Sequence, residues 1–376
     1  MIMSILSSII RCGLPSSELA SSNLDNSDVV SAKSSSRLSN IELLRIIAMI
    51  LVVVVHCDFY SLGAPTVGDY QSNPLSTITR VFVQAIAICC VNVFVLISGY
   101  FGIRQKSKSL VSFVYQILFI SIFLYTCCIL SGISSLNLTG IFECLCLTKA
   151  NWFVKAYLLL FILAPVLNAF VELKNRKLHR NILIYFFLMQ TVYGCLHAVS
   201  FFEDGYSTLS FIGLYLLGRY IYIYCPKFSS FKAKYDIMVY LLCVICLTIL
   251  SILMIRRNMG VYLSLFAYIN PLVIIESLAL LLFFGKFKFQ SKVINWIATS
   301  AFTVYLFHMY PTVLAYFKEC AIQIYSHTSG ISTLLYMGVF VLAVFVISVL
   351  LDQIRKYSYS SIIKVIRKYH NPTFLN

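Results

Sequence analysis

Long apolar stretches separated by short polar connections dominate this sequence. Of its 376 residues, 60% are hydrophobic and 11% are charged, against about 25% charged residues in an average globular chain. A helix needs about 20 apolar residues to cross the hydrocarbon core of a bilayer. Ten stretches reach or approach that length: 41–60, 77–100, 110–131, 152–171, 181–200, 208–224, 236–255, 261–284, 297–317 and 331–351.

These stretches predict an all-α fold, a polytopic integral membrane bundle of about ten transmembrane helices. Helices satisfy all of their backbone polar groups internally, as a membrane interior requires. The alternating segments of about ten residues that build a membrane β-barrel are absent from the sequence. The stretch at 208–224 is the shortest of the ten.

The basic residues predict which side of the membrane the ends of the chain face. When the connections are assigned to alternate sides, most Lys and Arg residues fall on one side, and Asp69 and Glu203 fall on the other. By the positive-inside rule the basic side is cytoplasmic, so both termini are expected there. Arg256 and Arg257 are the exception, since they lie in a connection expected outside.

Three segments are expected along the chain. Residues 1–36 form a Ser-rich tail that has too few apolar residues to bury a core, so we expect it to be disordered. Residues 37–355 form the transmembrane domain, and 356–376 form a basic cytoplasmic tail. The net charge of +15 is distributed loop by loop. It therefore predicts contact with anionic membrane lipids and no nucleic-acid partner.

Motifs of soluble enzymes are missing. Most of the 13 cysteines lie inside apolar stretches, and no Cys/His set has the spacing of a zinc site. There is no Gly-rich phosphate loop and no Gly-x-Ser-x-Gly sequence. We therefore expect no metal cofactor, and chemistry that depends on residues within the membrane.

Arg45 and His56 interrupt the first apolar stretch. Eleven residues turn a helix about 20° beyond three full turns, so the two side chains share one face, about 16.5 Å apart along the axis. Such residues at membrane depth normally face a bundle interior or a water-filled cavity. A reaction site is the functional interpretation. A structural histidine bonded to a neighbouring helix, and an arginine that extends to the lipid head groups, are the alternatives.

The segment from Glu42 to His56 (ELLRIIAMILVVVVH) closely resembles the opening helix of membrane-bound acyltransferase family 3. That family includes O-acetyltransferases of polysaccharides and lipid-linked glycans. Three later segments are similar to it in the same order: NVFVLISGYFGI, NWFVKAYLLLFILAPVLN and FTVYLFHMYP. The likeness extends from about residue 37 to 355. The third stretch departs from the family, because it opens with RQKSKSLVSF where many members have an Arg-rich motif with proline.

The resemblance implies an O-acyltransferase of the bacterial inner membrane. It would transfer an acyl group, most commonly acetyl from acetyl-CoA, from the cytoplasm to a hydroxyl of a cell-surface or lipid-linked glycan such as lipopolysaccharide or exopolysaccharide. Arg45 would bind a phosphate of the donor through forked hydrogen bonds. His56 would act as a general base on the acceptor hydroxyl, or as a nucleophile that carries the acyl group. Glu42 would orient Arg45 or cap the helix.

Further residues are assigned to the donor only through this resemblance. Arg104, Lys106 and Lys108 lie in the connection before the third stretch and would supply positive charge for coenzyme A.

Four other residues are candidates for acceptor binding: Ser98, Trp152, Tyr157 and His308. Each has a simpler reading. A small residue such as Ser98 permits close helix packing, and aromatic residues at a membrane edge are often interfacial anchors. His308 would then be a packing residue ahead of a proline.

A flippase or other carrier of lipid-linked oligosaccharides, or a polysaccharide polymerase, is the alternative function. Either would also place polar residues in a membrane cavity. A carrier commonly has paired halves with interrupted helices, which this sequence does not show. Neither alternative accounts for the spacing of Arg45 and His56.

Overall fold

The computed structural model describes residues 37–104, 107–148, 151–196 and 201–369. Every regular element in these ranges is a helix, which confirms the all-α prediction. The expected tail at 1–36 lies outside the described residues, as does Lys106. The α-helices are α2 (Ser39–Cys57), α3 (Phe59–Leu62), α4 (Val67–Ser72), α5 (Pro74–Ala87), α6 (Cys90–Phe101), α7 (Ser107–Leu130), α8 (Leu138–Cys144), α9 (Trp152–Glu172), α10 (Arg176–Met189), α11 (Thr208–Tyr224), α12 (Ala233–Arg256), α13 (Pro271–Gly285), α14 (Lys292–Ala298), α15 (Ala301–His308), α16 (Pro311–His327) and α17 (Ile331–Tyr369).

Four shorter elements complete the fold. The first is a π-helix, η1 (Gln190–Leu196), which continues α10. The 3₁₀ helices are η2 (Glu203–Gly205), η3 (Lys227–Ser230) and η4 (Gly260–Phe266).

Seven helical segments within the described residues are long and apolar enough to cross a membrane, so the protein is an integral membrane protein. They are Ser39–Leu62, Pro74–Phe101, Ser107–Leu130, Trp152–Glu172, Ala233–Arg256, Gly260–Gly285 and Ile331–Val365. The remaining three expected spans are short or broken. One is α10 with its π-helical continuation, one is α11 with 17 residues, and one is divided among α14, α15 and α16. The count of ten spans stays a prediction.

Proline decides where several helices begin. Proline has no N–H to lose and a suitable fixed φ, so it is favoured in the first turn of a helix, although Pro165 lies inside α9. Pro311 starts α16 and so divides the expected span 297–317. At the starts of α5 and α13, Asn73 and Asn270 also cap the helix, because each side chain accepts a backbone N–H of the first turn.

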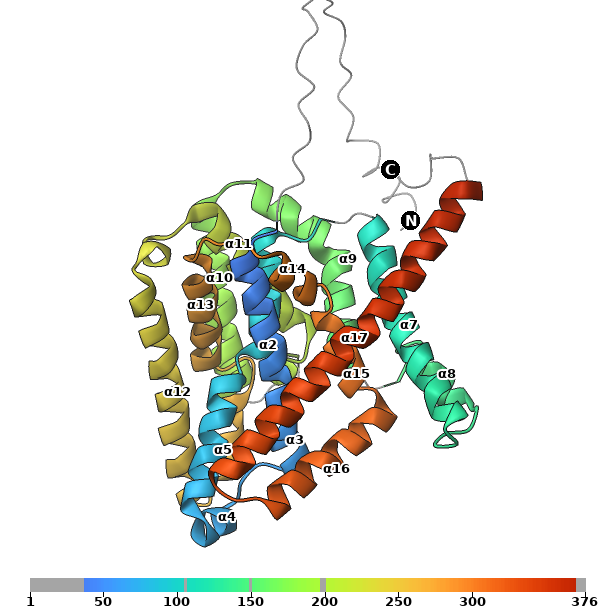
Figure 1. Ribbon diagram of the computed structural model, residues 1–376. Coiled ribbons are helices and arrows are strands. Elements are labelled where there is room, and N and C mark those ends of the chain that lie inside the picture. The colour runs from blue at the N-terminus through green and yellow to red at the C-terminus, as the bar shows by residue number, and fades with distance from the viewer. Residues whose placement is uncertain (1–36, 105–106, 149–150, 197–200, 370–376) are drawn as a thin grey trace, which may run out of the picture. The chain divides into compact units, whose positions relative to one another are not determined.

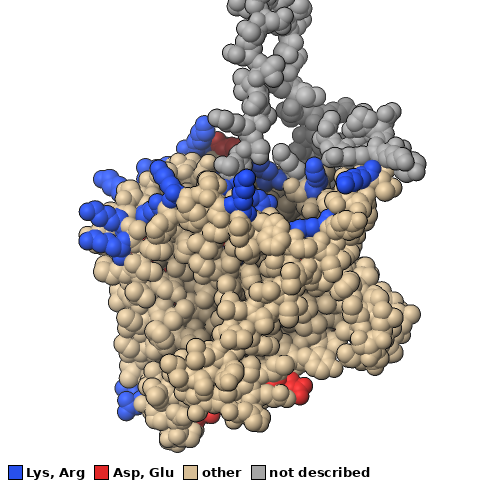
Figure 2. Space-filling model, viewed as in Figure 1, with Lys and Arg blue, Asp and Glu red and all other residues tan. Residues whose placement is uncertain are grey.

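Charge is unevenly distributed between the two ends of the helices. On the face drawn in Figure 2, most Lys and Arg side chains lie at the upper end, where α2 begins and α17 ends in Figure 1. Arg256, at the end of α12, instead stacks on the ring of Tyr70 in α4, 5.9 Å from its centroid, at the opposite end of the helices in Figure 1. The distribution agrees with the positive-inside rule, and the side on which the termini lie stays a prediction.

Helix α2 is held by polar contacts at its first residues. Ser39 lies within hydrogen-bond distance of Asn295 in α14, at 2.9 Å, and accepts the backbone N–H of Ser291 at 2.8 Å. The Asn40 side chain donates to the carbonyl of Phe284 at the end of α13, at 2.9 Å. Helices α5, α6, α13, α14, α15 and α17 all contact α2. Its position, and with it the direction of every polar side chain on it, is therefore fixed from several sides.

Glycine sets the distance between α6 and α11. A Cβ atom on Gly99 would lie 2.2 Å from the backbone oxygen of Tyr215, and one on Gly218 would lie 2.5 Å from the backbone oxygen of Leu96. Both contacts are with backbone, which cannot move aside as a flexible side chain can. The two helices pack this closely because small residues face each other.

This packing predicts that Gly99→Ala destabilises the protein by about 1–3 kcal/mol, since the extra methyl group overpacks the interface. Gly338→Ala is the matched control, because no atom lies within 4 Å of a Cβ atom there. It should be neutral or stabilise α17 by up to about 1 kcal/mol. The measurement is the apparent unfolding midpoint of each purified variant in detergent. Equal midpoints for the two variants would contradict the close-packing argument.

Candidate active site

One face of α2 lines a cavity of about 680 Å³. Arg45, Met49, Val52 and His56 contribute to its wall, and their spacing of four, three and four residues follows a single helical face. Side chains from α3, α5, α6, α7, α9, α15 and η4, together with Ala298 and Thr299 at the end of α14, contribute to the other walls. The two polar residues of α2 thus line the same cavity.

His56 is hydrogen-bonded to His308 of α15. The distance from His56 Nδ1 to His308 Nε2 is 2.8 Å, and His308 Nδ1 lies 2.5 Å from the carbonyl oxygen of Val304. A carbonyl only accepts, so His308 Nδ1 carries a hydrogen and, in a neutral ring, Nε2 is the acceptor. His56 Nδ1 therefore donates. This assignment, which follows from the hydrogen-bond network, leaves the Nε2 lone pair of His56 free for a ligand.

His308 contacts His56 on the side away from the cavity. His56 lines the cavity, whereas His308 is fully buried and is not part of the cavity wall. Tyr60 lies on another side of the imidazole, with its ring centroid 5.1 Å from that of His56. These contacts restrict the orientation of the His56 ring.

At a separate position on the cavity wall, Arg45 pairs with Glu42. The Nη1 atom of Arg45 lies 2.5 Å from Oε2 of Glu42, and the more exposed Arg37 lies 3.9 Å from the same oxygen. Glu42 is buried, and 28% of the Arg45 side chain is exposed. The guanidinium has five N–H donors, so one contact with Glu42 leaves donors for an anionic ligand in the cavity.

Three acceptor-binding candidates also line the cavity: Ser98, Trp152 and Tyr157. The Ser98 hydroxyl donates to the carbonyl of Phe94 at 2.9 Å, so the Tyr157 hydroxyl donates to Ser98 at 3.0 Å. Trp152 packs edge-to-face on Tyr206, with centroids 4.4 Å apart. Aromatic rings therefore cover much of the wall opposite α2.

Two of the basic residues assigned to the donor, Arg104 and Lys108, do not line this cavity. Both are exposed. Lys106 lies outside the described residues. Within the described part of the chain, no group of three or more His, Cys, Asp or Glu residues could hold a metal ion.

A family model described as an acyltransferase domain matches residues 38–353. The chain belongs to acyltransferase family 3. No curated protein and no solved structure matches the chain. Membership of this family makes the protein a membrane acyltransferase, and the matched region includes both histidines and Arg45.

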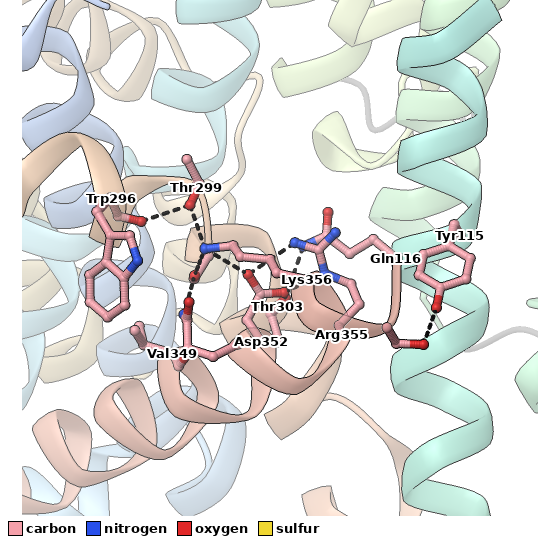
Figure 3. A network of polar contacts seen from close by, with 12 residues as sticks. Tyr115, Gln116, Trp296, Thr299, Thr303, Val349, Asp352, Arg355 and Lys356 are labelled. Atoms are coloured by element: carbon pink, nitrogen blue, oxygen red, sulfur yellow. Dashed lines mark hydrogen bonds and ion pairs between the residues drawn. The ribbon is translucent and has the colours of Figure 1, made fainter. Parts of the chain in front are cut away.

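Outside the motifs that suggested the family, sequence reasoning missed a buried polar network centred on Asp352 of α17 (Figure 3). Asp352 is fully buried and accepts two hydrogen bonds from Arg355, at 2.7 and 3.0 Å, and one from Thr303 at 2.6 Å. Lys356 lies 3.3 Å from the same carboxylate and donates to Thr299 at 2.6 Å. The only signal in the sequence was one acidic residue among apolar ones near the end of the last stretch.

The network joins the cavity wall to α17. Thr299 lines the cavity, and so does Gln116 of α7, which donates to Thr303 at 2.8 Å. All three donors of the Lys356 ammonium have partners, namely Thr299, Ser300 and Asp352, so Lys356 supports the wall and has no donor left for a ligand. Residue 356, at which the expected basic tail begins, lies inside α17.

Asp352→Asn is expected to destabilise the protein by about 3 kcal/mol, because Arg355 and Lys356 would keep their positive charges without a buried counter-charge. The unfolding midpoint in detergent measures the change. Glu172→Gln is the control, since Glu172 is exposed at the end of α9 and should unfold as the wild type does. A midpoint unchanged in Asp352→Asn would show that the network contributes little to the fold.

Proposed function

We propose that the protein transfers an acyl group, most simply acetyl, from cytoplasmic acyl-CoA to a hydroxyl of a cell-surface or lipid-linked glycan in the bacterial inner membrane. One observation carries the proposal: a single cavity is lined by both Arg45 and the histidine that His308 orients. An anionic donor and a hydroxyl acceptor need these two kinds of group. Family membership supports the acyl transfer itself.

In the proposed reaction, His56 is the general base. Its Nε2 atom takes the proton of the acceptor hydroxyl as the hydroxyl oxygen bonds to the thioester carbon, and such a base contributes about 10² to 10⁴-fold. The C–S bond then breaks, and the coenzyme A thiolate leaves and receives the proton held by His56. His308 stabilises the charged imidazole by accepting from Nδ1.

A covalent relay uses the same free nitrogen. In that route His56 Nε2 first bonds to the thioester carbon, and the C–S bond breaks as the coenzyme A thiolate leaves. The acceptor hydroxyl then takes the acyl group from the imidazole, the N–C bond breaks, and the hydroxyl proton goes to the thiolate. Incubation with donor alone separates the two routes, because only the relay leaves an acyl group on His56.

His56→Ala should lower coenzyme A release in the presence of acetyl-CoA and acceptor by at least about 10²-fold, the contribution of a positioned base. His327→Ala is the matched control, because His327 is exposed and lies outside this cavity. Wild-type turnover in His56→Ala would remove His56 from the mechanism.

The same assay tests the role of His308. His308→Gln keeps an oxygen that is able to accept from His56, so it should retain more activity than His308→Ala. Equal losses would argue against orientation through this hydrogen bond.

For Arg45 the proposed role is to bind a phosphate of the donor through two parallel hydrogen bonds. Lysine keeps the charge and loses that fork, so Arg45→Lys should raise the KM for acetyl-CoA about tenfold while largely sparing kcat. Arg37→Lys, at a side chain that is 52% exposed, should leave KM unchanged. If Arg45→Lys also leaves the KM for acetyl-CoA unchanged, Arg45 pairs with Glu42 and contacts the lipid head groups without binding the donor.

The alternative is a carrier or polymerase of lipid-linked glycans. Neither consumes acyl-CoA, so coenzyme A release that depends on His56 would exclude either as the sole activity. No feature of the cavity favours them over acyl transfer.

A further inference from the structure

Lys318 of α16 is a cation close to the proposed base. Its ammonium lies 4.1 Å from the ring centroid of Tyr60, and that ring is 5.1 Å from the imidazole of His56. Tyr60 lines the cavity, whereas Lys318 is not part of its wall. One aromatic ring therefore separates a positive charge from the nitrogen that would activate the acceptor.

No acidic group within the described residues forms an ion pair with Lys318. The acidic residues close to Tyr60 and Lys318 in the sequence have other partners. Asp58 pairs with Arg80, with 2.6 Å between Oδ1 and Nε, and Glu319 accepts from the side chain of Gln323 at 3.3 Å. A tyrosine ring attracts the ammonium through its π face and still leaves its N–H groups able to donate to an anion.

We propose that Lys318 binds an anionic group of the acceptor, a carboxylate or a phosphate, while a hydroxyl of the same sugar or its neighbour faces His56. The inference rests on the proposed function and narrows its acceptor to a negatively charged glycan. The acceptor would extend past the edge of the Tyr60 ring to make both contacts. A half-buried ammonium without a counter-charge gains most from a ligand that brings one, because a charge-assisted hydrogen bond is about twice as strong as a neutral one.

The experiment measures the binding of three sugars that share one ring: methyl glucoside, its uronic acid and its 6-phosphate. Ligand-observed NMR with the full-length protein in detergent gives a Kd for each and needs no turnover. In the wild type, at least one charged sugar should bind about tenfold more tightly than the neutral one, as one charge-assisted hydrogen bond provides. The sugar with the larger gain tells whether carboxylate or phosphate is preferred.

Lys318→Gln should abolish that tenfold advantage and leave the Kd of the neutral sugar unchanged. Lys318→Arg should retain most of it. Lys155→Gln is the matched control, because Lys155 is exposed and its ammonium already donates to the carbonyl of Thr148 at 2.7 Å. An unfolding midpoint equal to that of wild type shows that Lys318→Gln is folded. If Lys318→Gln does not fold, the Kd values of Lys318→Arg are used instead to test whether a cation at this position retains the charged-sugar advantage.

Equal affinity for charged and neutral sugars in the wild type, including no detectable binding of any, overturns the proposal. So does a charged-sugar advantage that persists in Lys318→Gln. Failure of the proposed acyl transfer is separate, since it would appear as coenzyme A release that does not depend on His56, whatever the sugars do.

Discussion

A membrane interior has no water to satisfy polar groups, and this constraint organises the structure around α2. Arg45 and His56 are costly at that depth unless partners or a cavity receive them. The bundle supplies both. Glu42 pairs with Arg45, His308 accepts from His56, and both Arg45 and His56 line one cavity. The anchoring of α2 by Ser39 and Asn40 matters because it keeps that face toward the cavity.

The cavity has different chemistry at its two polar positions. Arg45 shares its cavity wall with Thr299, which accepts from Lys356 and so connects the wall to the buried cluster of Asp352, Arg355 and Lys356. Near His56 the wall is largely aromatic, with Tyr60 and Trp152 as rings able to stack on a sugar. The first environment suits a phosphate-bearing donor. The second suits a glycan, as the proposed transfer between two sides of a membrane requires.

Apolar length and helical phase made part of the structure predictable from sequence. Seven of the expected spans have helices of sufficient length, and an eleven-residue separation was enough to place Arg45 and His56 on one face. Contacts between distant segments were not predictable. His308 lies 252 residues from His56, and the aromatic residues around it suggested packing as readily as chemistry. Pro311 was visible in the sequence, but the single span predicted over 297–317 did not allow for the helix break that this proline causes.

The roles proposed for Lys318 and His56 connect acceptor binding with proton transfer. When His56 takes a proton, its charge develops near the ammonium of Lys318, and two like charges separated by one ring repel each other. An anionic group bound to Lys318 offsets this repulsion at the moment when the hydroxyl is in place. A neutral acceptor would leave the repulsion intact. The same anion that improves binding would therefore also favour the proton transfer, so selection of a charged acceptor is expected in kcat as well as in KM.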